Sequence, residues 1–202
     1  MTQRRGPYAK SAMRRDAILD AALKVFATNG YWNGSLEEIA TEVGVTKPAL
    51  RYYFPSKEEL FTGVLERWDT LAFVVSPLDV SDPVEALRGL VRLTERNLSI
   101  PGVIALHTMT SIEATNPAHP AHEFYIRRYE FFRERITEIL EGCERLGLLA
   151  PGVVPARAAR SLGAVMDGLQ IQWLTDSESV DLVGDVAHHI EGLLVPAAGW
   201  TE

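Results

Sequence analysis

The sequence has very little cysteine: Cys143 is the single one among 202 residues. A disulfide within the chain and a cysteine-based zinc site are therefore excluded. Glycine and proline, at 15 and 11 residues, are too few for a collagen-like or low-complexity chain. No run of about 18 apolar residues is present, so we expect no membrane-spanning helix. Charged side chains interrupt the apolar stretch after the first basic residues, which argues against a signal peptide and predicts a cytoplasmic protein.

Acidic residues outnumber basic ones, at 27 against 20, and the formal net charge is -7. The excess lies in residues 61–202, which hold 11 basic and 20 acidic side chains. Residues 1–60 hold nine basic and seven acidic ones, and the first fifteen residues carry five basic side chains and no acidic one. A surface that binds nucleic acid must be locally positive, so the N-terminal part has a suitable charge. On charge alone, a solvated basic tail explains the pattern equally well.

Hydrophobic residues recur at helical spacing in nearly every segment, and no stretch alternates convincingly as a strand would. Capping residues, prolines and glycines delimit the expected helices. These cover residues 12–28, 35–43, 46–54, 56–75, 82–99, 103–114, 121–146, 155–174 and 180–194. The sequence therefore predicts an all-α protein. We expect a three-helix N-terminal domain over residues 1–60 and a larger helical domain over residues 61–202.

Two short helices joined by a tight glycine turn form the most informative pattern in the sequence. Ser35 and Glu38 make a capping box that starts the first helix, and Gly44 ends it. Thr46 caps the second helix, which carries polar and aromatic side chains outward: Lys47, Arg51, Tyr52 and Tyr53. This arrangement is typical of a helix-turn-helix, whose second helix lies in the major groove of DNA.

A longer signature surrounds this pattern. It consists of residues 18–22 with Phe26, Gly30 and Tyr31, then Ser35, Ile39, Ala40, residues 43–47 and residues 53–60. In order and spacing these residues, which span roughly 13–62, resemble the TetR family of bacterial transcriptional regulators. The resemblance implies an all-α homodimer whose N-terminal domain binds a near-palindromic double-stranded DNA operator. It also implies a C-terminal domain that binds a small effector, which releases the protein from DNA, and repression as the usual mode of action.

We expect DNA contacts from the helix-turn-helix and from the helix before it. The expected residues are Arg14, Arg15, Ser35, Thr46, Lys47, Arg51, Tyr52, Tyr53 and Lys57. Tyr53 and Lys57 are assigned to phosphates, and the two N-terminal arginines to the DNA backbone at the edge of the site. The family more often has tyrosine at the position of Arg51. An arginine there reads a guanine edge or contacts a phosphate, and both interpretations stay open.

A helical C-terminal domain of this size has room for a ligand between its helices. The expected lining combines apolar and a few polar side chains: Trp68, Ala72, Asn97, Met109, Glu113, Phe131, Gln170 and Trp173. The mixture favours a mostly apolar effector, although such residues are also typical of an ordinary core. His107, His119 and His122 lie near Glu113 in sequence. Loop histidines are usually exposed, so we expect neither a metal nor a cofactor.

Dimerisation is expected because a single helix-turn-helix binds DNA weakly, whereas two of them read half-sites about one helical turn apart. The helices over 121–146 and 155–174 would pair with those of a second copy as a four-helix bundle. The predicted interface consists of small and apolar residues: Ala158, Ala159, Leu162, Gly163 and Met166. A core face within one chain is the alternative for this stripe.

Two other functions are weighed against DNA binding. An all-α enzyme would use Glu113 with His107, but the sequence holds no nucleophile elbow, phosphate loop or cofactor fingerprint. A helical interaction protein would use the capped helices as structure only, which the cluster of Lys47, Arg51 and Tyr52 argues against. High salt would abolish binding to DNA and spare binding to a protein partner.

Overall fold

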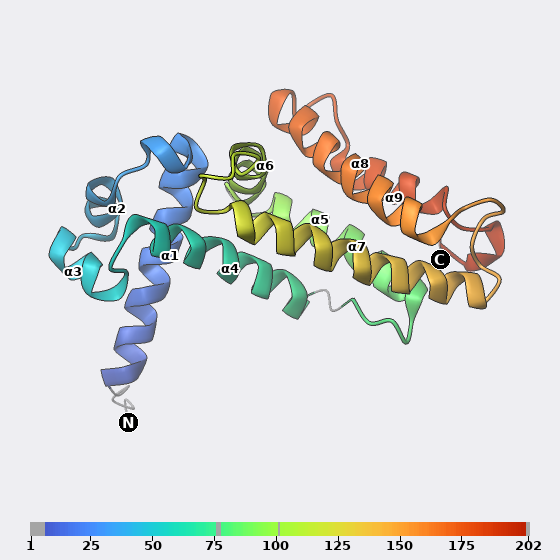
Figure 1. Ribbon diagram of the computed structural model, residues 1–202, viewed down its shortest axis with the longest axis horizontal. Helices are drawn as coiled ribbons and strands as arrows, with labels where there is room; N and C mark the ends of the chain where they lie inside the picture. The colour runs from blue at the N-terminus through green and yellow to red at the C-terminus, as the bar shows by residue number, and fades with distance from the viewer. Residues whose placement is uncertain (1–6, 76–77, 101, 201–202) are drawn as a thin grey trace. The chain divides into compact units, whose positions relative to one another are not determined.

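The computed structural model describes residues 7–75, 78–100 and 102–200. The helices in these ranges (Figure 1) are α1 (Pro7–Asn33), α2 (Leu36–Val43), α3 (Lys47–Tyr53), α4 (Lys57–Val75), α5 (Pro83–Leu98), α6 (Val103–Glu113), α7 (His122–Arg145), α8 (Pro155–Thr175), α9 (Leu182–Glu191) and the short 3-10 helix η1 (Pro196–Ala198). The described part of the chain has no β-strand, only a single bridge between Leu149 and Leu194. The predicted all-α fold is confirmed. None of the described helices has both the length and the apolar character that crossing a bilayer demands.

Two compact units make up the chain. The N-terminal unit holds residues 1–69 and 101–121, and the C-terminal unit holds residues 70–100 and 122–202. The structure thus divides the chain differently from the expected boundary at residue 60, because α4 contributes to both units and α6 joins the N-terminal one. Since α6 packs along α1, a segment distant in sequence supports the helix that precedes the helix-turn-helix.

The core of the N-terminal unit consists of large apolar side chains from α1 to α4. Ile18 and Phe26 of α1, Ile39 of α2, Leu50 of α3 and Phe61 of α4 are fully shielded from solvent. The rings of Phe26 and Phe61 meet edge to face with their centroids 4.8 Å apart. Burying a side chain of this size stabilises a fold by about 1.5–3 kcal/mol. Helix α1 packs against α2, and α2 packs against α3 (Figure 1).

Helix α1 changes direction near its end, because Gly30 has φ 69° and ψ 178°. Such a left-handed φ costs glycine little, whereas a residue with a side chain would be strained there. The first helix, expected over residues 12–28, therefore kinks at Gly30 and continues to Asn33. A Cβ on Gly30 would lie 2.8 Å from a carboxylate oxygen of Glu113, so the end of α1 is packed closely against α6.

The C-terminal unit is built around α7, which packs against α5 and α8, while α9 packs against the same two helices. Pro83 of α5 lies 3.1 Å from the position that a Cβ on Gly142 would take, so α5 and α7 are in close contact there. The core is aliphatic and includes Leu87, Leu90, Ile136, Ile139, Leu140, Val186 and Ile190. The buried residues of α8 all lie in its first half.

Candidate functional site

The helix-turn-helix is held by capped helix starts and a glycine turn. The Ser35 hydroxyl accepts a hydrogen bond from the N–H of Glu38 at 3.1 Å, and the Glu38 carboxylate accepts one from the N–H of Ser35 at 3.0 Å. Gly44 is left-handed, and Val45 after it donates its N–H to the carbonyl of Ala40 at 2.9 Å. The predicted capping box and turn are thus confirmed, and they fix the angle at which α3 leaves α2.

Helix α3 has one anchored side and one open side. Its anchor, Leu50, is 0% exposed. The Thr46 hydroxyl accepts a hydrogen bond from the N–H of Ala49 at 3.3 Å and so fixes the helix start. Tyr52 leaves 82% of its surface in solvent, although burial of an aromatic ring is favourable. The other exposed residues at this helix are Thr46, Pro48, Ala49 and Arg51. This helix therefore presents a polar and aromatic face to a partner molecule.

The two lysines expected to contact DNA have different surroundings. Lys47 forms an ion pair with Glu37 of α2, and hydrogen bonding to the lysine lowers the pKa of the Glu37 carboxyl. Because this pair is exposed and weak, a phosphate competes for the ammonium at little cost. Lys57 instead donates to the carbonyl of Trp32 at 3.1 Å and lies 4.6 Å from the centre of the Tyr31 ring. Burial lowers the pKa of Lys57, and this lysine holds the start of α4 against the end of α1.

The remaining residues expected to contact DNA are exposed or engaged within the chain. Arg14 and Arg15 are exposed on α1, and the Arg15 guanidinium lies 4.6 Å from the centre of the Phe54 ring. Tyr53 is half-buried, with its ring edge-on to that of Tyr52 at 5.3 Å. The two cap residues, Ser35 and Thr46, use their hydroxyls to accept hydrogen bonds within the chain.

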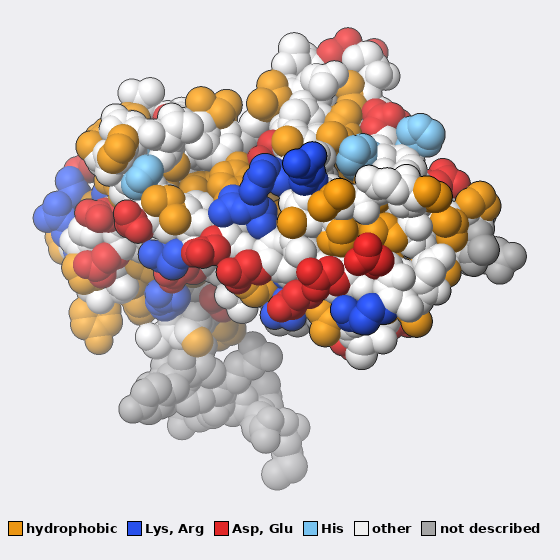
Figure 2. Space-filling view, turned by 45° about the vertical axis from the view of Figure 1, so that its right-hand side comes forward, with side chains coloured by type: hydrophobic (Ala, Val, Ile, Leu, Met, Phe, Trp, Pro, Cys, Tyr) orange, Lys and Arg blue, Asp and Glu red, His pale blue; other side chains and the backbone are white. Residues whose placement is uncertain are grey.

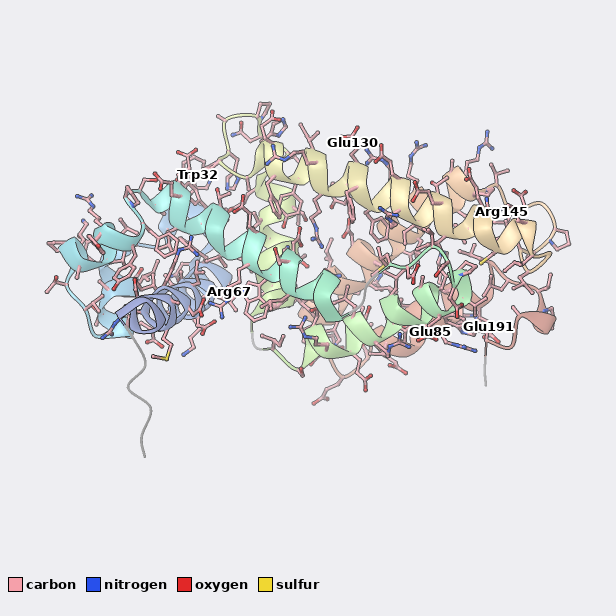
Figure 3. All side chains as sticks on the ribbon, turned by 90° about the horizontal axis from the view of Figure 1, so that it is seen from below. Trp32, Arg67, Glu85, Glu130, Arg145 and Glu191 are labelled. Atoms are coloured by element: carbon pink, nitrogen blue, oxygen red, sulfur yellow. The ribbon has the colours of Figure 1, made fainter. Side chains whose placement is uncertain are left out.

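Arg67 of α4 is an additional link that no sequence signal singled out. Its guanidinium lies 3.4 Å from the carboxylate of Asp16 and 3.2 Å from that of Asp20, both on α1 (Figure 3). It also donates to the carbonyl of Asp16 at 2.9 Å. The arginine neutralises two acidic groups on the helix that carries Arg14 and Arg15, which leaves that end of α1 more positive than its sequence alone indicates.

His119, expected to be an exposed loop histidine, is buried at 3% exposure. Its Nδ1 accepts a hydrogen bond from the N–H of Ala121 at 3.2 Å, and its Nε2 lies 3.4 Å from the carboxylate of Glu113. Burial lowers the pKa of the imidazole, although Glu113 acts in the opposite direction. Three rings surround it edge-on at 5.2 to 5.8 Å: Tyr31, Trp32 and Phe61. This corrects the expectation of an exposed side chain, since the imidazole is part of an aromatic cluster.

Glu113 belongs to the same cluster. Its carboxylate accepts a hydrogen bond from the N–H of Tyr31 at 3.4 Å, directly after the kink at Gly30. Together with its contact to His119, this bond ties the end of α6 to the end of α1. The structure thus gives Glu113 a structural role between α1 and α6, and its place in an effector site stays a prediction. In the described ranges, no group of three or more potential metal ligands comes together.

The other residues expected to line an effector site are divided between the two units. Trp68 belongs to the N-terminal unit, and its indole N–H is buried with no hydrogen-bond partner among the described residues. Met109 in the same unit and Phe131 in the other are 38% and 40% exposed, which corrects their assignment to an enclosed wall. The rest lie half-buried in the C-terminal unit: Ala72, Asn97, Gln170 and Trp173.

A polar cluster between α7 and α8 was missed from the sequence. The Tyr129 hydroxyl donates a hydrogen bond to the Asp167 carboxylate at 2.7 Å, and the rings of Tyr125 and Tyr129 lie 6.0 Å apart. Burial raises the pKa of Asp167 and holds that of Tyr125 well above its ordinary value. It also lowers the pKa of Arg128. The signal in the sequence that could have found it is the spacing of the two tyrosines, which lie four residues apart and so on one side of the helix.

Most of the α8 residues expected at a dimer interface are packed inside the protomer itself. Ala158, Ala159 and Leu162 are buried in the protomer core, and a Cβ on Gly163 would lie 3.2 Å from the ring of Phe132. These residues therefore fit the alternative of a core face within one chain. Met166 is half-buried. Hydrophobic side chains are nevertheless exposed among charged ones on the surface (Figure 2), and α8 contributes Ile171 and Leu174.

Comparison with known proteins gives matches in both parts of the chain. Residues 18–64 match the model "Bacterial regulatory proteins, tetR family", and residues 115–195 match "BetI-type transcriptional repressor, C-terminal". The transcriptional regulator TtgR of Pseudomonas putida is 31% identical over 192 residues, which cover 88% of each chain. This chain belongs to the TetR family.

Other TetR-family relatives match over different lengths. The transcriptional repressor NicS, also of Pseudomonas putida, is 43% identical over 94 residues, which are 45% of this chain and 44% of NicS. The solved structure of a regulator from Saccharomonospora viridis, in complex with choline, is 25% identical and superposes with a TM-score of 0.76. It covers 91% of this chain and 99% of that one. The protein is thus a TetR-type transcriptional regulator, and the family consists of regulators, not enzymes.

Proposed function

We propose that this TetR-family protein represses transcription by binding a near-palindromic DNA operator as a homodimer. The observation that carries the proposal is the outer face of α3, where Tyr52 is 82% exposed beside an exposed Arg51. The major groove of B-DNA is wide enough for one α-helix, and a recognition helix in this groove contacts base edges with its exposed side chains. An anchored helix with an unburied aromatic and a cationic side chain has the shape and chemistry for that groove.

Arg51 is the residue that we propose for sequence recognition. Its side chain is exposed on α3, directly after the buried Leu50 in sequence. An arginine that bonds to both O6 and N7 of guanine discriminates against the wrong base by about 1–3 kcal/mol. A phosphate contact by the same residue would instead weaken binding equally on all sequences.

The second half of α8 is the surface that we propose for the dimer. Ile171 and Leu174, 44% and 40% exposed, lie three residues apart and so share one side of the helix. Both follow the part of α8 that packs inside its own chain. Covering them with a second copy would remove apolar surface from water and would place two recognition helices on half-sites one or more helical turns apart.

We further propose that a small, largely apolar molecule bound in the C-terminal unit releases the protein from DNA. The Saccharomonospora viridis regulator, 25% identical to this chain, was solved in complex with choline, so a regulator of this fold binds a small molecule. The half-buried Gln170 and Trp173 of α8 supply polar and aromatic groups of the kind that such a site uses. A regulator with this function works in the cytoplasm, where the bacterial chromosome lies.

Fluorescence anisotropy on the DNA next to the protein's own coding sequence tests the proposal. We expect tighter binding to this DNA than to scrambled DNA, and a loss of roughly tenfold or more between about 50 and 200 mM salt, because bound phosphates release counterions. Arg51→Ala should weaken binding on the preferred sequence more than on its single-base variants. The matched control is Arg92→Ala, which removes an exposed arginine of the C-terminal unit that pairs with Glu85.

The two competing functions give different results in the same experiment. A protein that only interacts with other proteins would bind neither the DNA next to its coding sequence nor the scrambled DNA. Its binding to a protein partner would persist at high salt. If neither this DNA nor a duplex selected from random sequences is bound, the operator proposal is wrong. If Arg51→Ala weakens DNA binding equally on every sequence, Arg51 contacts a phosphate and does not read a base.

A further inference from the structure

Helix α2 carries three acidic side chains, and each of them has a different partner. The Glu38 carboxylate closes the capping box at the start of its own helix. The Glu42 carboxylate accepts a hydrogen bond from Lys24 of α1 at 2.9 Å. The Glu37 carboxylate instead reaches α3, where it forms an ion pair with Lys47. Glu37 is therefore the acidic residue of α2 that lies beside the helix proposed for the major groove.

Two positive side chains of α3 act on the Glu37 carboxylate. Hydrogen bonding to Lys47 lowers the pKa of this carboxyl, and the charges of Lys47 and Arg51 lower it as well. The carboxylate is therefore ionised at neutral pH. The Glu37 side chain leaves 63% of its surface in solvent, and Arg51 is exposed too. A negative charge thus stands beside the cationic side chains of the face that is proposed to enter DNA.

This negative charge opposes binding to DNA in general. Binding that does not depend on sequence comes from lysine and arginine side chains that neutralise phosphates. The Glu37 carboxylate occupies the Lys47 ammonium and also repels the phosphates themselves. On any DNA, the carboxylate therefore reduces affinity unless it makes a favourable contact with a base.

Cytosine is the base whose major-groove edge suits a carboxylate. It presents the N4 amino group as a donor, whereas guanine presents two acceptors and thymine presents one acceptor and a methyl group. Adenine has an amino group as well, but the N7 acceptor lies directly beside it. A carboxylate in the groove therefore gains a hydrogen bond from cytosine and is repelled by guanine.

The Glu37 carboxylate has the capacity for such a bond. An ionised carboxylate has about four acceptor positions, and the ion pair with Lys47 engages the oxygen Oε1. A phosphate that attracts the Lys47 ammonium would release this oxygen too. Since the charge of Arg51 also acts on Glu37, the bases that these two side chains contact should belong to the same base pair or to adjacent pairs.

We propose that Glu37 determines specificity at the operator by accepting a hydrogen bond from the N4 amino group of a cytosine. This inference rests on the proposed function, because it names a second base-reading residue on the same DNA-binding surface. Glu37 differs from Arg51 in the sign of its general effect: it lowers the affinity for most sequences and increases the discrimination between them. Specificity is a difference between affinities, so a residue that penalises the wrong sequences contributes to it.

Selection from random duplex DNA with the wild type and with Glu37→Ala tests this role. The variant should lose the preference for cytosine at one position in each half-site and keep the rest of the motif. Fluorescence anisotropy on the selected operator and on scrambled DNA then gives the ratio of the two affinities. This ratio should fall about fivefold or more in Glu37→Ala, while the affinity for scrambled DNA stays the same or rises. Retained binding to scrambled DNA also shows that the variant is folded.

Glu42→Ala is the matched control, because it removes the same charge from the same helix. Glu42 is exposed and pairs with Lys24 of α1. This variant should change the affinities for the operator and for scrambled DNA by the same factor, and it should select the wild-type motif. A comparison of the two variants therefore separates base reading from the general effect of one negative charge.

The proposal is overturned if Glu37→Ala keeps the wild-type motif and the wild-type ratio of affinities, because Glu37 would then act only as a charge. Weaker binding of Glu37→Ala to all sequences by one factor would also overturn it, because Glu37 would then only position Lys47. If the wild type itself selects no motif, the proposed function fails and this inference fails with it. A wild-type motif that Glu37→Ala reproduces contradicts the role of Glu37 alone.

Discussion

Replacing His107 on α6 is expected to flatten the dependence of stability on pH. Burial lowers the pKa of this imidazole to about 4, from an ordinary value of about 6.5. The unfolded chain therefore takes up a proton at higher pH than the folded one, so the free energy of unfolding falls as the pH drops from 6.5 towards 4. For a single group with these two pKa values, the loss between pH 7.5 and pH 5 is about 2 kcal/mol.

Urea unfolding of the wild type and of His107→Gln at pH 7.5 and pH 5 measures this contribution. The wild type should lose about 2 kcal/mol more than the variant over that interval. Burial also lowers the pKa of His119 and His189, but both groups remain in the variant and cancel in the difference. His188→Gln, at a largely exposed histidine, should behave as the wild type does. An equal loss of stability in His107→Gln and the wild type would refute the reasoning.

Three further substitutions test individual parts of the structure. Ser35→Ala removes the hydroxyl that accepts from the Glu38 N–H, and urea unfolding should show a loss of about 1 kcal/mol; an unchanged midpoint would contradict the capping role. Leu50→Ala leaves a cavity under α3, and should cost about 2–5 kcal/mol in urea unfolding and weaken operator binding; full affinity would show that α3 needs no anchor. Leu174→Glu places a charge on the exposed part of α8, and sedimentation should show a shift towards monomer, whereas an unchanged dimer would place the interface elsewhere.

Local signals predicted the helix-turn-helix well because its stability comes from neighbours in sequence. The Ser35–Glu38 capping box spans three residues, and the left-handed turn at Gly44 involves only the residues beside it. A helical stripe likewise predicts which residues face inward, as Leu50 and Ile18 show by their complete burial. For such features the pattern in the sequence and the interaction in the structure cover the same few residues.

Contacts between distant segments could not be predicted in the same way. Glu113 lies 82 residues after Tyr31 and still accepts its N–H, and Lys57 turns to the carbonyl of Trp32 instead of pointing outward. The small residues on α8 correctly indicated that another helix packs closely against it. Their spacing, however, does not tell whether that helix belongs to the same chain or to a second copy. The acidic Asp167 was not singled out because its only described hydrogen bond comes from α7, 38 residues earlier.

Selection of bound sequences from random duplex DNA, with the wild type and with Arg51→Ala, tests the central claim most directly. We expect the wild type to enrich an inverted repeat whose half-sites are centred about one helical turn, or a multiple of it, apart. We also expect Arg51→Ala to lose the preference at one G·C pair in each half-site and to keep the rest of the motif. A wild-type protein that enriches no motif would contradict the assignment of α3 as a DNA-reading helix, and an unaltered motif from Arg51→Ala would contradict the role given to Arg51.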